Sequence, residues 1–222
     1  MERETGATGP ERLRVTEIFH SIQGESRTVG WPTVFVRLTG CPLRCIYCDT
    51  EYAFQGGHWM ALEAVLEAVG RHRARYVTVT GGEPLAQPAC LDLLSRLCDG
   101  GYEVLLETSG ALDVSAVDGR VVKVMDLKTP GSGEVDKNRY ENLKRLTPLD
   151  QVKFVLCDRA DYAWARGMVY EYRLHERCEV LFSPVYGELD ARALAEWILE
   201  DHLPVRFQIQ LHKQLWGEAP GH

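Results

Sequence analysis

The 222-residue sequence contains no apolar run that approaches the ~20 residues needed to cross a bilayer. Its first residues, MERETGATGPERLR, also lack the apolar region of a secretory signal. Linkers are missing too, because no interior stretch is rich enough in Pro, Gly or Ser to separate two domains. These absences predict a cytoplasmic protein without a membrane segment. We expect one domain over residues 1–222, with residues 1–14 as a flexible N-terminal segment.

Positive charge is in deficit. Lys and Arg number 25 against 32 Asp and Glu, and the formal net charge is -7. No run of Lys and Arg forms a stripe that would follow a phosphate backbone, so we expect no direct binding to nucleic acid. The hydrophobic content of 45% is enough for one sizeable core.

Strand-like apolar runs alternate with amphipathic helical stretches along the chain. In residues 61–70, for example, apolar side chains recur at helical spacing while two glutamates face away. The alternation predicts an α/β fold with parallel strand pairing. The expected strands are 33–40, 76–82, 103–110, 121–128, 151–156, 179–185 and 205–211, and the expected helices are 61–70, 91–98, 162–172 and 191–199. The loop-like stretch 129–142 follows a strand end, where α/β folds collect functional loops.

The sequence has one CxxC pair, Cys45 and Cys48, and no second pair. Cys41 lies just upstream, so three thiols are clustered without a fourth. A structural zinc site needs four ligands, which would require a histidine brought close by folding. Three thiolates on one loop instead suit three irons of a 4Fe-4S cube whose fourth iron stays open. The other cysteines fall in apolar patterns and are expected to be buried thiols: Cys90, Cys98, Cys157 and Cys178.

The three-cysteine loop, with Tyr47 before its last cysteine, resembles the cluster loop of the radical S-adenosylmethionine superfamily. The turn GGEP at residues 81–84 resembles the GGE motif of the same superfamily. The resemblance implies that S-adenosylmethionine chelates the open iron and is cleaved reductively to a 5'-deoxyadenosyl radical. It also implies that Glu83 accepts a hydrogen bond from the ammonium of this cofactor. Either motif alone is weak, but the two together favour the radical enzyme over zinc and an ordinary turn.

Further segments resemble the 7-carboxy-7-deazaguanine synthase family over nearly the whole chain. They are EIFHSIQGE (17–25), VFVRL (34–38), CDT (48–50), ETSG (107–110) and LHK (211–213). The resemblance implies a modified, incomplete (β/α) barrel, usually a homodimer. It implies a lyase that converts 6-carboxy-5,6,7,8-tetrahydropterin to 7-carboxy-7-deazaguanine with loss of ammonia, in 7-deazapurine (queuosine) biosynthesis. The implied cofactors are a 4Fe-4S cluster, S-adenosylmethionine and Mg²⁺, and the implied partner is an electron donor such as flavodoxin or ferredoxin.

By this resemblance, the substrate-binding residues are Ile22, Gln23, Gly24, Glu25, Arg37, Thr80 and His212. The Gln23 amide offers a donor and an acceptor to a pterin edge, although a polar turn residue also fits there. An inward-facing Arg37 needs an anion, which the substrate carboxylate would supply. Strand alternation does not decide whether Arg37 faces inward or outward. His212 is expected at the end of the last strand, where a surface histidine is the ordinary alternative.

The resemblance places Mg²⁺ at Thr50, whose hydroxyl is a weak oxygen ligand, although Thr also often caps or turns. The residues aligned with cofactor contacts are Tyr47, Cys48, Asp49, Gly82, Glu83, Asp126, Leu127, Lys128, Ser183, Pro184, Val185 and Tyr186. The chain departs from the family in three places. Asp126 and Leu127 stand where many relatives carry Ser-Pro, Ser183 replaces a frequent Gln, and Ser26 replaces a frequent Gly.

Two other classes of protein remain open from the sequence. A glycyl-radical-activating enzyme would share the three cysteines and the GGEP turn, but it would lack the substrate residues Gln23, Glu25 and Arg37. A zinc or structural module would be colourless and indifferent to S-adenosylmethionine. Iron content therefore separates the metal hypotheses, and substrate binding separates the enzymes.

Overall fold

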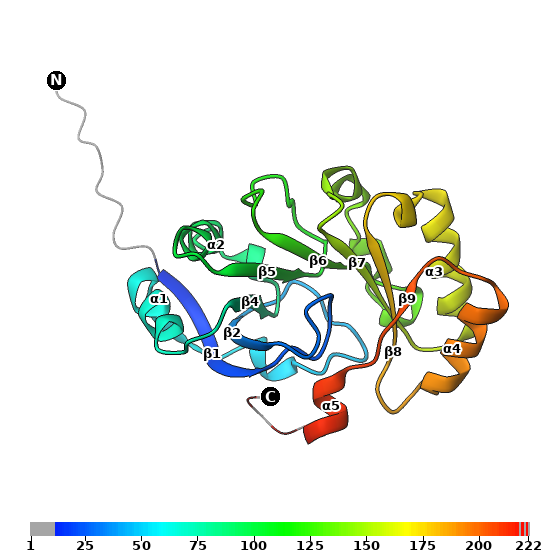
Figure 1. Cartoon of the computed structure of the whole chain (residues 1–222), viewed down its shortest axis with the longest axis horizontal. Helices are drawn as coiled ribbons and strands as arrows, with labels where there is room; N and C mark the ends of the chain where they lie inside the picture. Colours follow the sequence, from blue (N-terminus) through cyan, green and yellow to red (C-terminus); the bar gives the residue numbers. More distant parts are fainter. Residues whose placement is uncertain (1–11, 218, 220, 222) are drawn as a thin grey trace.

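The computed structural model describes residues 12–217, 219 and 221. Within them lies a nine-stranded sheet in the order β3-β1-β2-β4-β5-β6-β7-β8-β9. Neighbouring strands run parallel from β2 to β9, whereas β1 pairs antiparallel with both β2 and β3. The sheet curves without closing (Figure 1), so the predicted incomplete (β/α) barrel is confirmed. The strands are β1 (Arg12–Ile22), β2 (Pro32–Leu38), β3 (His58–Ala61), β4 (Tyr76–Gly81), β5 (Glu103–Thr108), β6 (Val122–Asp126), β7 (Gln151–Leu156), β8 (Glu179–Pro184) and β9 (Arg206–Phe207).

Helices cover the outside of the curved sheet. Helices α1 and α2 lie on the side of β1, β4 and β5, and α3 and α4 lie on the side of β7 and β8 (Figure 1). Helix α3 begins at Arg159 rather than at residue 162, because the Asp158 side chain caps it by accepting from the Asp161 N–H. No helix in the described part of the chain is long and apolar enough to span a membrane. The helices are α1 (Leu62–Gly70), α2 (Cys90–Asp99), α3 (Arg159–Glu171), α4 (Ala191–Glu200) and α5 (Leu211–Trp216).

Two apolar clusters fill the space between the sheet and these helices. One joins β1, β2, β4 and β5 to α1 and α2, and the other joins β6, β7 and β8 to α3 and α4. In the second cluster, Phe182 meets Phe154 and Tyr162 edge to face, with ring centroids 5.4 and 5.9 Å apart. Cys90 and Cys178 are buried in these clusters as predicted, whereas Cys98 and Cys157 are only partly buried.

The sequence prediction lacked the strands β1 and β3 and assigned the start of β1 to a flexible segment. β1 alternates polar and apolar residues irregularly, with a register shift between Val15 and Glu17, so its pattern does not stand out. β3 has only four residues. Residues 12–14 were expected in a flexible segment but instead begin β1 and pair with β3. The rest of that segment, residues 1–11, lies outside the described residues.

The last expected strand, 205–211, is mostly wrong. β9 contains only Arg206–Phe207, and α5 begins at Leu211, so His212 lies in the first turn of a helix. The chain leaves the sheet here because it turns toward the barrel interior, where Gln210 donates to Glu25 and the Leu211 N–H donates to the Gly24 carbonyl at 3.0 Å. The stretch 129–142 forms short 3-10 turns, with Ser132 and Asn142 buried.

Candidate active site

A cavity of about 380 Å³ opens where the carboxyl ends of the parallel strands meet the loop 39–50. Side chains from β2, β4, β5, β6 and β7 reach it, together with residues that follow β1, β8 and β9. This is the end of a β/α fold where catalytic residues collect. Its lining includes Glu25, Arg37, Cys41, Cys45, Tyr47, Cys48, Asp49, Thr50, Thr80, Gly82, Glu107, Asp126, Lys128, Lys153, Val185, Tyr186, Gln210 and Lys213.

All three clustered thiols line this cavity. The Cys48 N–H donates to the Cys45 carbonyl at 3.2 Å, and the Cys41 sulfur accepts from the Leu43 N–H at 3.4 Å. Each thiol is partly buried, and burial raises the pKa of Cys45 to about 11. The thiols therefore stay protonated until a metal displaces the protons.

This donor set fits an iron-sulfur cube better than a single zinc ion. Zinc needs ligands that converge on one point, and among the described residues no group of three His, Cys, Asp or Glu is arranged to hold one metal ion. A cube binds one thiolate per iron, so three thiols can face different corners of a larger cavity. Within the described chain, Cys41, Cys45 and Cys48 are the only cysteines that line the cavity, which leaves one iron for a non-protein ligand.

Gly82 allows the GGEP turn to lie directly against the cysteine loop. A Cβ at Gly82 would overlap the Gly40 carbonyl oxygen and would lie 2.8 Å from the Cβ of Cys41. The Glu83 N–H also donates to the Gly40 carbonyl at 2.8 Å. The motif therefore fixes the position of the first cysteine through the backbone.

Glu83 does not reach the cavity, contrary to the expected contact between its side chain and the cofactor. The Glu83 side chain is fully buried, and its carboxylate accepts from Thr108, Ser109 and the Leu85 N–H. Protein donors therefore satisfy this carboxylate. Its role in the structure is to join the turn after β4 to the end of β5.

Arg37 faces the cavity, which settles the question that strand alternation left open. Its Nε lies 2.7 Å from Oε1 of Glu17 on β1, and the Arg37 side chain is 14% exposed. The Tyr52 hydroxyl donates to the same Glu17 oxygen at 2.9 Å. Glu17 was absent from the sequence prediction, and it supplies an anion that holds the Nε side of the guanidinium.

Gln23 and Glu25 lie next to each other but differ in access to the cavity. Glu25 lines the cavity, where its Oε1 accepts from Gln210 at 2.8 Å. Gln23 is 2% exposed and donates to Thr78 at 3.0 Å and to Glu107 at 3.4 Å. It therefore positions Glu107, a cavity residue that also accepts from Thr80 at 2.9 Å. Burial, together with the nearby Glu25 carboxylate, raises the pKa of Glu107.

Asp126 and Lys128 meet in the cavity wall at the end of β6. Lys128 Nζ lies 2.9 Å from Asp126 Oδ2. Burial opposes ionisation of Asp126, but Lys128 and Lys153 lower its pKa. The other oxygen, Asp126 Oδ1, is buried without a hydrogen-bond partner among the described residues. A buried acceptor without a partner in a cavity wall fits a ligand that brings an O–H or N–H donor, such as the ribose or ammonium of S-adenosylmethionine.

Leu127, by contrast, is fully buried and packs in the second apolar cluster. The expected cofactor contact is therefore not available to its side chain. The Leu127 N–H donates to the Lys153 carbonyl at 2.9 Å. This hydrogen bond and the buried side chain together fix the backbone between Asp126 and Lys128. Alternation along the strand explains this, because neighbouring side chains point to opposite faces.

Asp49 and Thr50 form an oxygen-rich corner of the cavity. The Thr50 hydroxyl donates to Asp49 Oδ1 at 2.8 Å, and Lys213 Nζ lies 2.9 Å from Asp49 Oδ2. Burial opposes ionisation, but Lys213 lowers the pKa of Asp49. The Tyr47 hydroxyl donates to the Val155 carbonyl at 3.4 Å, which turns the Tyr47 ring toward the end of β7.

The cofactor contacts expected at residues 183–186 divide into two kinds. Val185 and Tyr186 line the cavity, and Lys213 lies over the Tyr186 ring at 5.4 Å. Ser183 and Pro184 are buried and do not line it. They end β8, so they place Val185 and Tyr186 rather than present their own side chains.

The cavity lining does not include three of the expected substrate residues, His212, Gly24 and Ile22. His212 packs on Gly24, where an added Cβ would overlap the imidazole Nδ1. Burial lowers the pKa of His212. Glycine at position 24 therefore allows α5 to approach the segment that carries Gln23 and Glu25.

Several polar residues of the cavity lining were not predicted as site residues, among them Glu107, Lys153, Gln210 and Lys213. Glu17, which pairs with Arg37, was not predicted as a site residue either. Glu107 and Lys213 lie within the ETSG and LHK segments, so the resemblance already marked their positions. Glu17 likewise lies within the segment 17–25, whereas Lys153 and Gln210 lie in none of these segments. A lysine between Val152 and Phe154 shows only that one face of that strand is polar.

Comparison with known proteins agrees with this geometry. The family model described as Radical SAM superfamily matches residues 35–126, which include the cysteine loop and the GGEP turn. The crystal structure of QueE from Escherichia coli superposes with a TM-score of 0.74 at 22% identity, covering 90% of this chain and 95% of that one. Fold, cysteine loop and cavity thus define a radical S-adenosylmethionine enzyme, with a 4Fe-4S cluster and S-adenosylmethionine as its cofactors.

Sequence relatives identify the family within that class. A 7-carboxy-7-deazaguanine synthase from Chlorobaculum tepidum is 46% identical over 208 residues, which cover 92% of this chain and 94% of the relative. One from Koribacter versatilis is 43% identical over 219 residues, covering 92% and 97% respectively. The chain belongs to the 7-carboxy-7-deazaguanine synthase family, which confirms the resemblance stated from its motifs.

Proposed function

We propose that the protein converts 6-carboxy-5,6,7,8-tetrahydropterin to 7-carboxy-7-deazaguanine with loss of ammonia, in 7-deazapurine (queuosine) biosynthesis. The observation that carries this proposal is the shared cavity. Three thiols for the cluster lie at one end, and charged side chains from other strands and loops line the rest, among them Arg37, Glu25, Glu107 and Lys153. Family membership supplies the substrate class.

The cluster and its cofactor are held by residues at one end of the cavity. Cys41, Cys45 and Cys48 would hold a 4Fe-4S cluster through three thiolates, which would leave one iron open to S-adenosylmethionine. When bound, the cofactor supplies a 5'-deoxyadenosyl radical that abstracts hydrogen from the substrate. Asp126 Oδ1 accepts from the cofactor, and Tyr47, Val185 and Tyr186 enclose its apolar parts.

The pterin is held by charged and polar groups at the other end. Arg37 pairs with the substrate carboxylate, since Glu17 fixes its Nε while the guanidinium faces the cavity. Glu25 and Glu107 accept from the ring and amino N–H groups, and Thr80 and Gln23 keep Glu107 oriented. Burial and the neighbouring Glu25 carboxylate raise the pKa of Glu107.

We place Mg²⁺ at Thr50. Its hydroxyl and the Asp49 carboxylate are adjacent oxygen donors in the cavity wall, which suit a cation that keeps several waters and also binds the substrate carboxylate. We also propose an electron donor such as flavodoxin or ferredoxin, and a second copy of the chain in a homodimer, as partners. We place the enzyme in the cytoplasm.

The test is turnover of the reconstituted enzyme without oxygen. Protein, reductant, Mg²⁺ and the carboxytetrahydropterin are mixed with less than one equivalent of S-adenosylmethionine, and products are measured by mass spectrometry. Because the cofactor is regenerated, 7-carboxy-7-deazaguanine should exceed the S-adenosylmethionine supplied, with ammonia released in equal amount. A protein that carries the cluster and binds S-adenosylmethionine but leaves the pterin unchanged would exclude this function and favour a glycyl-radical-activating enzyme.

A further inference from the structure

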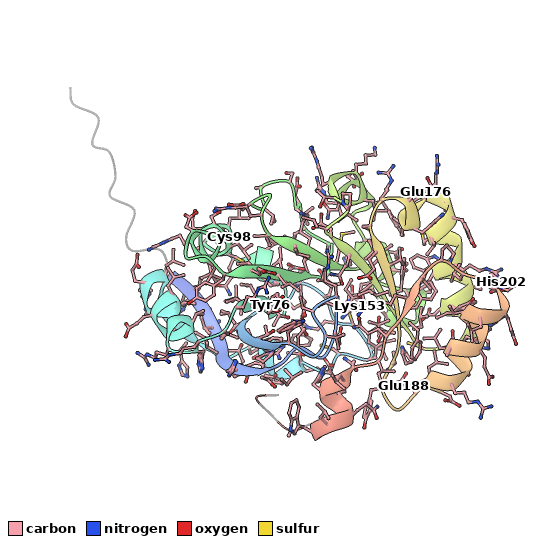
Figure 2. The ribbon with its side chains drawn as sticks, viewed as in Figure 1. Tyr76, Cys98, Lys153, Glu176, Glu188 and His202 are labelled. Atoms are coloured by element: carbon pink, nitrogen blue, oxygen red, sulfur yellow. The ribbon has the colours of Figure 1, made fainter. Side chains whose placement is uncertain are left out.

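Lys153 lies at the centre of the charged groups in the cavity. Its Nζ is 2.5 Å from Glu25 Oε2 and 3.7 Å from Asp126 Oδ2, and the side chain is 12% exposed. Figure 2 shows Lys153 near the middle of the molecule, whereas Glu176 and His202 lie at its periphery. Glu25 follows β1 and Asp126 ends β6, so one ammonium on β7 connects two segments that are far apart in the sequence.

The two carboxylates belong to different halves of the site. Glu25 lies on the side proposed for the pterin, and Asp126 lies on the side proposed for S-adenosylmethionine. Asp126 retains a second cation, Lys128, at 2.9 Å. Glu25 forms an ion pair with Lys153 and accepts from the neutral amide of Gln210 at 2.8 Å. Loss of Lys153 therefore removes the cation next to Glu25 but leaves Lys128 next to Asp126.

A second buried lysine offers a comparison elsewhere in the fold. Lys123 lies 3.1 Å from Asp150, and the two side chains are 6% and 1% exposed. Neither residue lines the cavity. This pair has the same chemistry as Lys153 with Glu25 but lies at the amino-terminal end of β6, so it serves packing and backbone order alone.

We propose that Lys153 is a positioning residue. Its ammonium keeps the Glu25 carboxylate ionised and oriented toward the pterin. Through its contact with Asp126, it also fixes Glu25 relative to the S-adenosylmethionine side of the cavity. This rests on the proposed function, because the pterin defines what Glu25 must face. Two fixed carboxylates with one ammonium between them keep substrate and cofactor in one relative orientation, which a radical abstraction of a single hydrogen requires. Lys153 thus acts on the pterin through Glu25.

The test compares Lys153→Met with Lys123→Met, which removes the matched buried cation away from the cavity. Both variants lose stability, because each leaves a buried carboxylate without its partner. Binding is measured by anaerobic titration calorimetry of the pterin into enzyme loaded with cluster and S-adenosylmethionine, without reductant. We expect Lys153→Met to weaken pterin affinity by roughly 10- to 100-fold and S-adenosylmethionine affinity by less than about 3-fold. Lys123→Met should leave both affinities unchanged.

Two further variants keep the proposal testable should Lys153→Met fold poorly. Lys153→Arg keeps the charge and should restore most of the pterin affinity. The double variant Glu25→Gln/Lys153→Met removes both charges together, so it avoids an unpaired buried carboxylate. If Lys153 acts through Glu25, the double variant binds pterin about as weakly as Glu25→Gln alone, because the two losses are not additive.

The outcomes separate this inference from the proposed function. Wild-type enzyme that does not bind or convert the pterin would overturn the proposed function itself. Wild-type conversion together with unchanged pterin affinity in Lys153→Met would overturn the role of Lys153 alone. Additive losses in the double variant, or equal losses for pterin and S-adenosylmethionine, would also overturn it, because they indicate a structural role.

Discussion

Arg37 on β2 and Glu17 on β1 form an ion pair with Nε and Oε1 2.7 Å apart, directly across the antiparallel strands that begin the sheet. Arg37 also lies over the rings of Phe19 and Tyr52, at 5.6 and 5.8 Å from their centroids. The guanidinium is thus oriented before any substrate arrives. A site that recognises a carboxylate gains affinity from such preorganisation.

Replacement of Arg37 by Lys should keep the charge but lose the planar, bidentate geometry. We expect pterin binding to weaken by about 1 to 3 kcal/mol while iron content and S-adenosylmethionine binding stay intact. The measurement is pterin affinity of the cluster-loaded variant beside wild type. Unchanged pterin affinity would show that Arg37 serves only its contacts with Glu17 and the two rings.

Replacement of Cys45 by Ala should abolish the cluster, because two thiolates remain for three irons. Anaerobically prepared wild type should contain about four irons per chain, and the variant close to none. Cys98→Ala is the matched control, since Cys98 is a partly buried thiol on α2 away from the cavity. A Cys45→Ala protein that keeps its full iron content would contradict the assignment of this loop.

Replacement of Glu83 by Gln should lower the stability of the fold, whatever its effect on cofactor binding. The carboxylate accepts from Thr108, Ser109 and the Leu85 N–H, so an amide NH₂ would face donors. We expect a loss of about 1 to 3 kcal/mol in the free energy of unfolding, measured by denaturant titration. Glu63→Gln, at an exposed position on α1, should cause little change. Equal stability of Glu83→Gln and wild type would show that the carboxylate is not needed to join the two strand ends.

His212 should be neutral at pH 7, because burial lowers its pKa from 6.5. A lowered pKa means that the folded state disfavours the protonated imidazole, so this residue contributes to stability above the unfolded pKa and loses that contribution as the pH falls through the lowered value. The measurement is an NMR titration of the imidazole, with a midpoint expected below 6.5. A midpoint above 6.5 would mean that the attraction of Glu25 and Asp49 for the protonated imidazole raises the pKa of His212 more than burial lowers it.

The sequence predicted the part of the fold that depends on strong periodicity, and it missed the part that does not. Strands such as β4 and β7 are apolar enough to be recognised alone. β1 was missed because its polar residues, Glu17 among them, face the Arg37 side of the sheet and break the apolar pattern. β9 was overextended, because apolar alternation continues past Phe207 although the chain has already left the sheet.

In the site, too, the residues marked by local sequence spacing were predicted, whereas those whose roles depend on contacts made by folding were not. Cys41, Cys45 and Cys48 share a cavity as expected, since their spacing places them on one loop. Glu83 was expected in the cavity, but donors at the end of β5 hold it in the interior. Lys153 and Glu17 could not be assigned, because each obtains its role from a partner on another strand.

The most direct test of the account is electron paramagnetic resonance of the reduced, anaerobically purified enzyme, recorded with and without S-adenosylmethionine and accompanied by an iron and zinc count. Three thiolates and an open iron predict about four irons per chain and a cluster signal that changes when S-adenosylmethionine binds. Stoichiometric zinc without iron, or a cluster signal indifferent to S-adenosylmethionine, would contradict the account.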